Sequence, residues 1–334
     1  MPRLNLIYGN GKRFSNASGR PACLDAVATR LDKTKREPPE ALSELNRLIG
    51  LKAVKELVWE LYAYVEVGQW RAREGLPNEA TVLHMVFFGN PGTGKTTVAR
   101  LLARLFKELG VLSKGHLVEV ERADLVGEYI GHTAQKTREQ VKRALGGILF
   151  VDEAYSLARG GEKDFGREAI DTLVRAMEHH RNEFVLILAG YRKEMGIFLR
   201  ANPGLRSRLP IQIDFPDYTA AELMEIAKHF LAERRYRLSP PAERYLERHL
   251  RNMVDSGASA QGNARLVRNL LEKAIRHQAV RLLGKTMVTR EDLMTLEPED
   301  FPELFHFSFQ TQEGTSRKAE GTEKAYQVGV VPPH

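Results

Sequence analysis

The sequence predicts a three-layer α/β domain built on a parallel sheet, followed by a small all-α domain. The first observation is a regular alternation of strand and helix patterns between residues 84 and 215. The second is that residues 148–151 and 184–189 are continuous apolar runs, which are typical of strands buried on both faces of a parallel sheet. The third is that only helical patterns follow Pro216. Strand–helix alternation of this kind indicates a sheet with helices packed on both faces.

The strands and helices of the first domain can be placed in chain order. Apolar residues at helical spacing predict a helix at residues 54–65, ahead of the sheet. The sheet follows, and its strands are separated by helical patterns or turns. The predicted strands are 84–88, 117–120, 148–151, 184–189 and 211–215, and the first two helices between them are 96–109 and 133–145.

The pattern changes to helices alone after the fifth strand. Thr219 and Ser239 are suitable N-cap residues, residues 264–283 form a strong amphipathic helix, and Thr289 begins a capping box with Asp292 in place of glutamate. We therefore expect a basic N-terminal extension, a large α/β domain, a small helical domain and a loose C-terminal tail. Their expected ranges are 1–40, 41–215, 216–300 and 301–334.

Composition excludes several classes of protein. The net charge is +7, but residues 1–40 hold eight Lys and Arg against four Asp and Glu, so +4 of the excess lies in that segment. The rest is only mildly basic, which argues against a nucleic-acid partner. Cys23 is the single cysteine, which excludes an intramolecular disulfide and a cysteine metal cluster. No apolar run approaches the roughly 18 residues of a membrane span, and no signal peptide is evident, so we expect a cytoplasmic protein.

A complete phosphate-loop pattern lies between the first strand and its helix. It runs Gly-Asn-Pro-Gly-Thr-Gly-Lys-Thr from Gly89 to Thr96. Its glycines allow backbone N–H groups to surround phosphate oxygens, and the helix N-terminus adds positive charge. Lys95 is predicted to reach the β- and γ-phosphates of ATP, and Thr96 to bind Mg²⁺. The expected nucleotide-binding residues of this loop are Asn90, Pro91, Gly92, Thr93, Gly94, Lys95, Thr96 and Thr97.

Two adjacent carboxylates follow the third strand. Asp152 is predicted to hold Mg²⁺, and Glu153 to orient and polarise the attacking water. The alternative is that these carboxylates cap the next helix. The four histidines considered as metal ligands, His84, His132, His179 and His180, have no partners at ligand spacing, so they are expected to be solvated or core residues.

Together with the helical domain behind them, these motifs resemble those of the AAA+ ATPases over residues 41–300. Longer runs resemble a subgroup of sporulation proteins and red-type rubisco activases: residues 89–101, 121–137, 146–173 and 202–208. The resemblance implies ATP and Mg²⁺ as cofactors and assembly with other copies of the chain, as a homo-hexamer. It also implies that Ile49 and Gly50, within Leu48–Leu51, contact adenine, although helix-entry packing is the alternative for this short motif.

The resemblance also assigns roles to three arginines. Arg206 and Arg208 stand just before the fifth strand, where AAA+ proteins present an arginine finger to the neighbouring subunit. Arg208 is the favoured finger, with Arg206 as a helper or an alternative. Arg265 stands where a lid arginine reaches back to the nucleotide. Tyr191 occupies the place where many AAA+ proteins carry a polar sensor residue. Its hydroxyl could substitute for that residue, or Gly190 and Tyr191 could form a packing turn.

The segment Gly127–Thr133, Gly-Glu-Tyr-Ile-Gly-His-Thr, places Tyr129 and Ile130 between glycines in a charged stretch. In an AAA+ hexamer, the loop after the second strand lines a central pore, so Tyr129, Ile130 and Gly131 are predicted to grip a client polypeptide. The alternative is that Tyr129 packs beneath its own loop. Residues 160–165 are a candidate second pore loop.

The function favoured by these features is ATP-driven remodelling or threading of a client protein, in bacterial sporulation. The alternatives are rubisco-activase-like remodelling, an ATP-switched nucleic-acid loader, and a nucleotide-dependent scaffold. A loader is expected to carry basic residues in its pore loops, and residues 127–133 carry neither lysine nor arginine. The sequence leaves open the client, the oligomer size, and the roles of residues 1–40 and 311–334.

Overall fold

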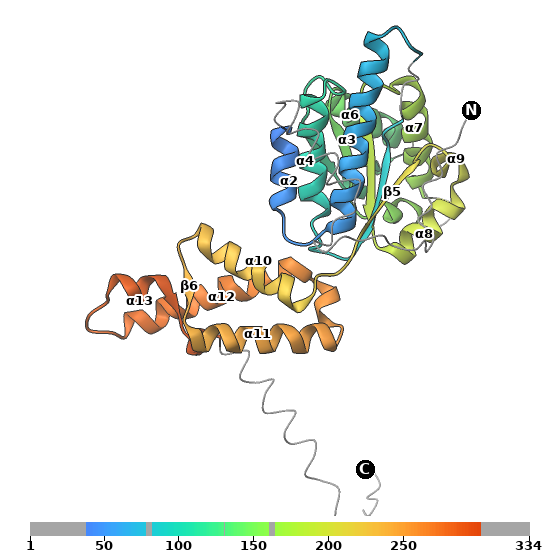
Figure 1. The fold of residues 1–334 in the computed structure, drawn as a ribbon. Helices are drawn as coiled ribbons and strands as arrows, with labels where there is room; N and C mark the ends of the chain where they lie inside the picture. The colour runs from blue at the N-terminus through green and yellow to red at the C-terminus, as the bar shows by residue number, and fades with distance from the viewer. Residues whose placement is uncertain (1–37, 78–81, 130, 160–163, 302–334) are drawn as a thin grey trace, which may run out of the picture. The chain divides into compact units, whose positions relative to one another are not determined.

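The computed structural model describes residues 38–77, 82–129, 131–159 and 164–301 (Figure 1). The chain divides into two compact units. Of the described residues, the first unit contains those up to Ala227 together with Leu250–Arg268, and the second contains Lys228–His249 and those from Asn269 onward.

The first unit is built on a five-stranded sheet in the order β2-β3-β4-β1-β5. All four neighbouring pairs are parallel; Met85 of β1, for example, pairs with Ile187 of β4 and with Ile211 of β5. Because the strands are parallel, their carboxyl ends share one edge of the sheet. The strands are β1 (Met85–Gly89), β2 (Leu117–Val120), β3 (Ile148–Val151), β4 (Val185–Gly190) and β5 (Ile211–Phe215).

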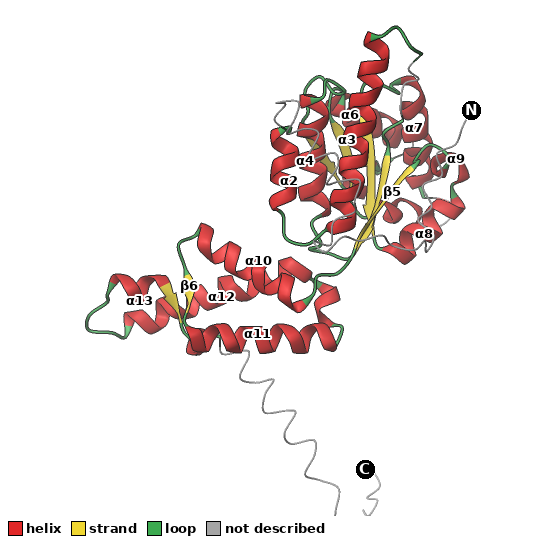
Figure 2. Cartoon of the chain, in the orientation of Figure 1, coloured by secondary structure: helices red, strands yellow, loops and turns green. Residues whose placement is uncertain are grey.

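Helices cover the sheet on both sides, so the predicted three-layer α/β fold is confirmed (Figure 2). The helices are α2 (Glu40–Arg47), α3 (Lys52–Arg73), α4 (Lys95–Glu108), α5 (Arg122–Leu125), α6 (His132–Ala144), η1 (Ala154–Ala158), α7 (Gly166–His179), α8 (Arg192–Ala201) and α9 (Pro203–Arg206). The five predicted strands and the predicted helices at 96–109 and 133–145 agree with these bounds to within about two residues, and the helix predicted at 54–65 is longer. No range was predicted for α2, α5, η1, α7, α8 and α9.

The core of the first unit lies along the central strands. Every residue of β3 and β4 is buried, as their continuous apolar sequences predict. Phe87 of β1 packs its ring 4.9 Å from that of Phe215 and 6.4 Å from that of Phe150, measured between centroids. His84, just before β1, is also buried and accepts a hydrogen bond from the backbone N–H of Leu186 at 3.0 Å. It is therefore a core histidine.

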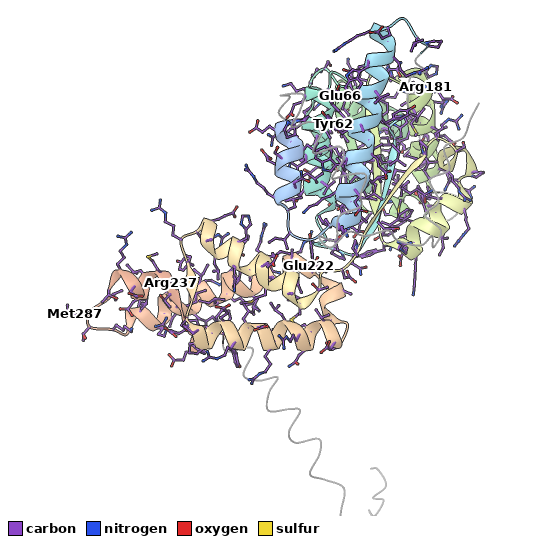
Figure 3. The ribbon with its side chains drawn as sticks, in the orientation of Figure 1. Tyr62, Glu66, Arg181, Glu222, Arg237 and Met287 are labelled. Carbon is purple, nitrogen blue, oxygen red and sulfur yellow. The ribbon has the colours of Figure 1, made fainter. Side chains whose placement is uncertain are left out.

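The second unit is largely helical. It is formed from parts of α10 (Ala220–Glu233), α11 (Pro240–Asp255) and α12 (Asn263–Leu283), with α13 (Arg290–Met294) and the 3-10 helix η3 (Pro298–Asp300). The 3-10 helix η2 (Ala258–Gln261) precedes α12. A short parallel pair, β6 (Arg237–Leu238) with β7 (Thr295–Leu296), was not predicted, because two-residue strands carry no periodic signal. Arg237 is also ion-paired with Glu291, and Met287 projects from the turn before α13 (Figure 3).

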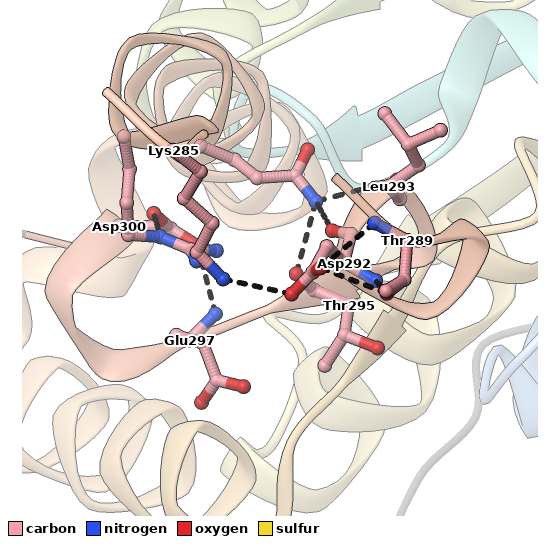
Figure 4. Close-up of polar contacts among 9 residues, drawn as sticks. Lys285, Thr289, Asp292, Leu293, Thr295, Glu297 and Asp300 are labelled. Atoms are coloured by element: carbon pink, nitrogen blue, oxygen red, sulfur yellow. Dashed lines mark hydrogen bonds and ion pairs between the residues drawn. The ribbon is translucent and has the colours of Figure 1, made fainter. Parts of the chain in front are cut away.

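Polar contacts organise the end of the second unit (Figure 4). Thr289 caps α13 through a reciprocal capping box with Asp292, as predicted, and Lys285 donates to Asp292 at 2.8 Å. The Gln278 amide donates to the backbone oxygens of Asp292, Leu293 and Thr295. Arg281 binds both oxygens of the buried Asp300, each at 2.8 Å. These contacts give hydrogen-bond partners to polar groups at the ends of α13 and η3.

Within the residues that the structure describes, no helix combines the length and the apolar composition that crossing a bilayer requires.

Candidate functional site

The phosphate loop lies at the carboxyl edge of the sheet, between β1 and α4. Gly92 has φ +72° and Gly94 has φ +96°, a left-handed backbone that glycine adopts without strain. A Cβ added to Gly92 would lie 2.1 Å from the backbone oxygen of Gly262, so this position also requires a residue without a side chain. The local sequence thus produces a tight turn that ends at the first residue of α4, Lys95.

Lys95 lies among the charged residues predicted for the site. Its ammonium donates to the backbone oxygens of Gly89 at 2.9 Å and Asn90 at 2.8 Å. Burial lowers the pKa of Lys95, the carboxylates of Asp152 and Glu153 oppose that effect, and the guanidinium of Arg265 adds to it. The fold therefore brings these four predicted residues into electrostatic contact.

The two carboxylates directly follow β3. Asp152 is half-buried and accepts a hydrogen bond at 2.9 Å from the backbone N–H of Glu153. Glu153 is exposed and has φ +46°, a left-handed conformation that is uncommon outside glycine. No side chain caps the following helix η1, so helix capping does not account for the two carboxylates.

The donors present fit a magnesium ion held jointly with phosphate. Thr96, on the first turn of α4, is half-buried, and Thr97 is exposed. Over the described ranges, no group of three or more His, Cys, Asp or Glu could hold a metal alone. Mg²⁺ is ordinarily bound by one or two protein oxygens, substrate phosphates and water. The Thr96 hydroxyl and the Asp152 carboxylate match that requirement.

The segment containing Ile49 and Gly50 borders the loop. A Cβ on Gly50 would lie 2.4 Å from Glu222 Oε1 and 3.3 Å from the ring of Tyr218; Glu222 is labelled in Figure 3. Tyr218 donates its hydroxyl to the backbone oxygen of Thr93 at 3.3 Å, and burial raises the pKa of this phenol to about 12. The predicted adenine segment and the phosphate loop therefore share Tyr218 as a neighbour.

Sequence reasoning missed three residues of this region: Asp217, Tyr218 and Asn263. Asp217 accepts hydrogen bonds from Asn90 and Asn263, and the backbone N–H of Ala264 donates to the oxygen of Gly92 at 3.2 Å. A carboxylate two residues after β5 is a detectable signal, because all parallel strands end at the same edge. Its asparagine partners could not be identified without the fold.

Tyr191 lies in a packed aromatic corner. Its ring centroid is 5.8 Å from that of Tyr155, and a Cβ on Gly190 would lie 2.7 Å from Tyr155 Cδ1. Burial and the nearby Glu153 carboxylate raise the pKa of Tyr155 well above its ordinary value. These contacts favour a packing turn at Gly190–Tyr191, and they place Tyr155 beside the predicted catalytic glutamate.

The two candidate finger arginines lie away from their own phosphate loop. Both precede β5, at the amino edge of the sheet, whereas Gly89 pairs with Phe215 at the carboxyl edge. Arg208 is ion-paired with Glu178 of α7 and donates to the oxygen of Gly204 at 2.6 Å. Arg206 is exposed.

The segment 127–133 presents an exposed aromatic side chain. Tyr129 is 66% exposed, and its ring meets the ring of His132 edge-on at 5.5 Å. Tyr129 is therefore not packed beneath its own loop. The backbone N–H of Gly127 donates to Thr133 Oγ1 at 3.0 Å, which ties the two ends of the segment together. Ile130 and residues 160–163 of the candidate second loop lie outside the described residues.

The fold and this site define the class of protein. Residues 85–217 match the family described as ATPase family associated with various cellular activities (AAA), and residues 219–313 match the AAA lid domain. The chain belongs to the AAA ATPases, with a parallel-sheet P-loop domain followed by a helical lid, and it is an ATP hydrolase.

Within this family, the chain is similar to several known proteins. The chain is 58% identical over 299 residues to stage V sporulation protein K of Bacillus subtilis (strain 168), covering 89% of this chain and 93% of that protein. It is 46% identical over 266 residues to the chloroplastic ribulose bisphosphate carboxylase/oxygenase activase of Cyanidioschyzon merolae (strain NIES-3377 / 10D), covering 78% and 90%. Among solved structures, a Thermotoga maritima RuvB mutant aligns with TM-score 0.51 at 19% identity, over 81% of this chain and 73% of that one, which is a likeness of fold alone.

Proposed function

We propose that this ATPase is a cytoplasmic, magnesium-dependent protein-remodelling motor, which assembles into a homo-hexameric ring and pulls a client polypeptide during bacterial sporulation. The observation that carries the proposal is Tyr129, which is 66% exposed on a glycine-flanked loop following β2. The similarity to stage V sporulation protein K supports the process. We assign the nucleotide-binding domain to residues 41–215 and the lid to 216–300, with extensions at 1–40 and 301–334.

Each nucleotide-site residue has a role in this proposal. The loop from Asn90 to Thr97 cradles the phosphates, Lys95 leaves its carbonyl partners to bind the β- and γ-phosphates, and Ile49 with Gly50 borders the adenine. Thr96 and Asp152 hold Mg²⁺, which neutralises phosphate charge when bound. Glu153, the exposed carboxylate at the strand end, orients the attacking water and accepts its proton.

The positions of two arginines support assembly into a ring. Arg206 and Arg208 precede β5, whose first residue pairs with Met85, while the phosphate loop begins at Gly89, the last residue of β1. Four strand steps of about 3.3 Å separate the two ends of these paired strands by roughly 13 Å, so an arginine at the amino end acts more readily on a second copy's nucleotide. Arg208 is our candidate finger and Arg206 the helper or alternative.

Tyr129 supplies the grip on the client. A polypeptide passed through a pore must be held without regard to sequence, and an aromatic ring offers large apolar area while Gly131 gives the backbone freedom. Ile130 is the expected second contact. Gly131 has φ +83°, and a Cβ added to it would meet nothing within 4 Å.

The test is ATP-driven unfolding of a tagged model protein by the full chain. Tyr129→Ala is expected to abolish unfolding while most ATPase activity remains, and Tyr129→Phe is expected to retain unfolding because the ring persists. Tyr64→Ala is the matched control, since Tyr64 is an exposed aromatic residue of α3. Unfolding by Tyr129→Ala at the wild-type rate would overturn the threading mechanism.

A second candidate client is rubisco, because one relative is named as its activase. The same motor would then remodel inhibited rubisco, which is measured as recovery of carboxylation with ATP. Recovery that disappears in Tyr129→Ala would assign rubisco as the client; absence of any recovery would leave sporulation as the process. Salt-sensitive DNA binding by the wild-type protein would instead favour a nucleic-acid loader.

A further inference from the structure

The first turn of α12 is hydrogen-bonded to the phosphate loop through a buried asparagine. Asn263 is only 1% exposed. Its amide nitrogen donates to Asp217 Oδ1 at 2.8 Å and to the backbone oxygen of Pro91 at 3.3 Å. Its amide oxygen accepts from the backbone N–H of Tyr218 at 3.0 Å. Both polar atoms of this side chain are therefore occupied, one of them by the phosphate loop itself.

Asp217 extends this contact to a second point of the loop. Its two carboxylate oxygens each lie 2.9 Å from the side-chain nitrogen of Asn90. One carboxylate thus joins an asparagine of the phosphate loop to an asparagine at the start of α12. We call Asn90, Asp217 and Asn263 the asparagine brace. Hydrogen bonds to an ionised acceptor are stronger than neutral ones, so the brace holds its three segments together firmly.

The backbone at this contact explains the residue types. Asn263 has φ +44°, a left-handed conformation that asparagine tolerates better than most residues. Gly262 presents its oxygen so close to Gly92 that no side chain fits between them. Replacing Asn263 by alanine would therefore remove the amide and also strain the backbone, whereas glycine would remove the amide alone.

Arg265 follows the brace by two residues. It lies close enough to Lys95 to lower the pKa of that lysine, so the two cations share one region. The same turn of α12 that carries Arg265 is fixed by Asn263 to the loop that carries Lys95. A bound polyphosphate would meet the loop N–H groups, Lys95 and Arg265 together, and holding them in place beforehand reduces the ordering cost of binding.

We propose that Asn263 is a positioning residue of the nucleotide site, which acts with Asp217 to hold the phosphate loop and Arg265 in register for the nucleotide phosphates. The inference rests on the proposed function only in placing ATP at this loop and Arg265 near it. It requires neither a pore nor a client.

The experiment measures equilibrium affinity for a fluorescent ADP analogue, together with KM and kcat for ATP, in the full chain. Asn263→Gly and Asn263→Ala are both expected to weaken ADP affinity about tenfold and to raise KM more than they lower kcat. Equal losses of ADP affinity in the two variants would show that the Asn263 amide is responsible. Wild-type affinity in Asn263→Gly with a loss only in Asn263→Ala would overturn the proposal, because the backbone alone would then explain the effect.

The matched control is Arg235→Ala. Arg235 is exposed and has φ +59°, so its replacement imposes a similar backbone cost away from the phosphate loop, and ADP affinity is expected to stay unchanged. If Asn263→Ala does not fold, Asn90→Ala breaks the brace from the loop side and is expected to weaken ADP binding. Wild-type affinity in Asn90→Ala would also count against the brace.

A double-mutant cycle tests whether the brace acts through Arg265. In an Arg265→Ala background, Asn263→Gly is expected to weaken ADP binding by clearly less than tenfold, because part of its effect is already lost. Full additivity would overturn the link to Arg265. These measurements contain no client, so a failure of the brace is distinguishable from a failure of the threading mechanism, which only the unfolding assay reports.

Discussion

Arg208 pairs its guanidinium with the carboxylate of Glu178, on α7, thirty residues earlier in the chain. Its hydrogen bond lowers the pKa of the Glu178 carboxyl, which favours the ionised carboxylate. Arg206, two residues before Arg208, is exposed. The fold therefore orients Arg208 and presents Arg206 to solvent on the same short segment, and the proposed ring makes a different prediction for each of them.

Replacing the proposed finger arginine is expected to stop hydrolysis without preventing ATP binding. Arg208→Ala should lower kcat about 10³-fold, because a trans arginine stabilises charge that develops on the transferred phosphoryl group. Arg206→Ala should have a smaller effect, and Arg200→Ala, an exposed arginine of α8, is the control. Phosphate release and ATP affinity are the measurements; a large loss in Arg206→Ala alone would identify Arg206 as the finger.

Mixing two inactive proteins tests whether that arginine acts on a neighbouring copy. Arg208→Ala supplies intact phosphate loops, and Lys95→Ala supplies intact arginines. Mixed assemblies are expected to regain part of the ATPase activity, with an optimum at intermediate ratios. No recovery at any ratio would contradict action in trans.

Glu153→Gln should bind ATP and fail to hydrolyse it. The amide cannot accept the proton of the attacking water, so kcat is expected to fall about 10²- to 10⁴-fold with little change in ATP affinity. Phosphate release and retained nucleotide are the measurements, and Glu168→Gln on α7 is the control. A protein that keeps its cellular function as Glu153→Gln would be a nucleotide-dependent scaffold and not a motor.

Arg122 is expected to couple hydrolysis to movement of the Tyr129 loop. It opens α5, just before that loop, and donates to the backbone oxygen of Ser156 at 2.6 Å and to Asp164 at 2.5 Å. Arg122→Ala should lower client unfolding several-fold more than ATPase activity, and it should cost about 2 kcal/mol of stability because these bonds are partly buried. The ratio of unfolding to ATP consumption is the measurement.

Arg100→Ala provides the comparison for Arg122, since Arg100 makes an exposed ion pair with Glu119. Its effect on the free energy of unfolding is expected to be below about 1 kcal/mol, and the ratio of client unfolding to ATP consumption is expected to be unchanged. The same ratio of client unfolding to ATP consumption in Arg122→Ala and in the wild type would contradict the proposed role of Arg122.

His84 makes folding stability depend on pH. Burial lowers its pKa from 6.5 to about 4. The folded state keeps the imidazole neutral where an unfolded chain would protonate it, so the contribution is complete above about pH 6.5 and is lost as the pH falls toward 4. The loss is about 3 kcal/mol.

The measurement for His84 is the free energy of unfolding by urea between pH 4 and 7. His84→Leu is expected to be less stable at pH 7, because the backbone N–H of Leu186 loses its acceptor, but to show a flatter pH dependence. His179→Gln, at an exposed position, should keep the wild-type slope. An unchanged slope in His84→Leu would contradict the prediction.

Local patterns determined most of the first unit. The apolar runs of β3 and β4 could only be buried strands, and the glycines of residues 89–94 encode a turn that few other sequences adopt. The order of motifs then placed Lys95, Asp152 and Glu153 at one edge, because parallel strands end together. What the sequence determined by itself was therefore the class of fold, and it predicted the candidate nucleotide site and the candidate client loop, each of which depends on short-range pattern or strand direction.

Only the tertiary structure could identify contacts between distant segments. Asn90, Asp217 and Asn263 lie in three separate parts of the chain, and no periodicity relates them. The same holds for Arg208 with Glu178 and for Arg122 with Asp164. The exposure of Tyr129 was likewise decided by the fold, because a glycine-flanked aromatic residue can be buried or exposed with the same local sequence. Hydrogen bonds and burial depend on which surfaces packing brings together, and that information is spread over the whole chain.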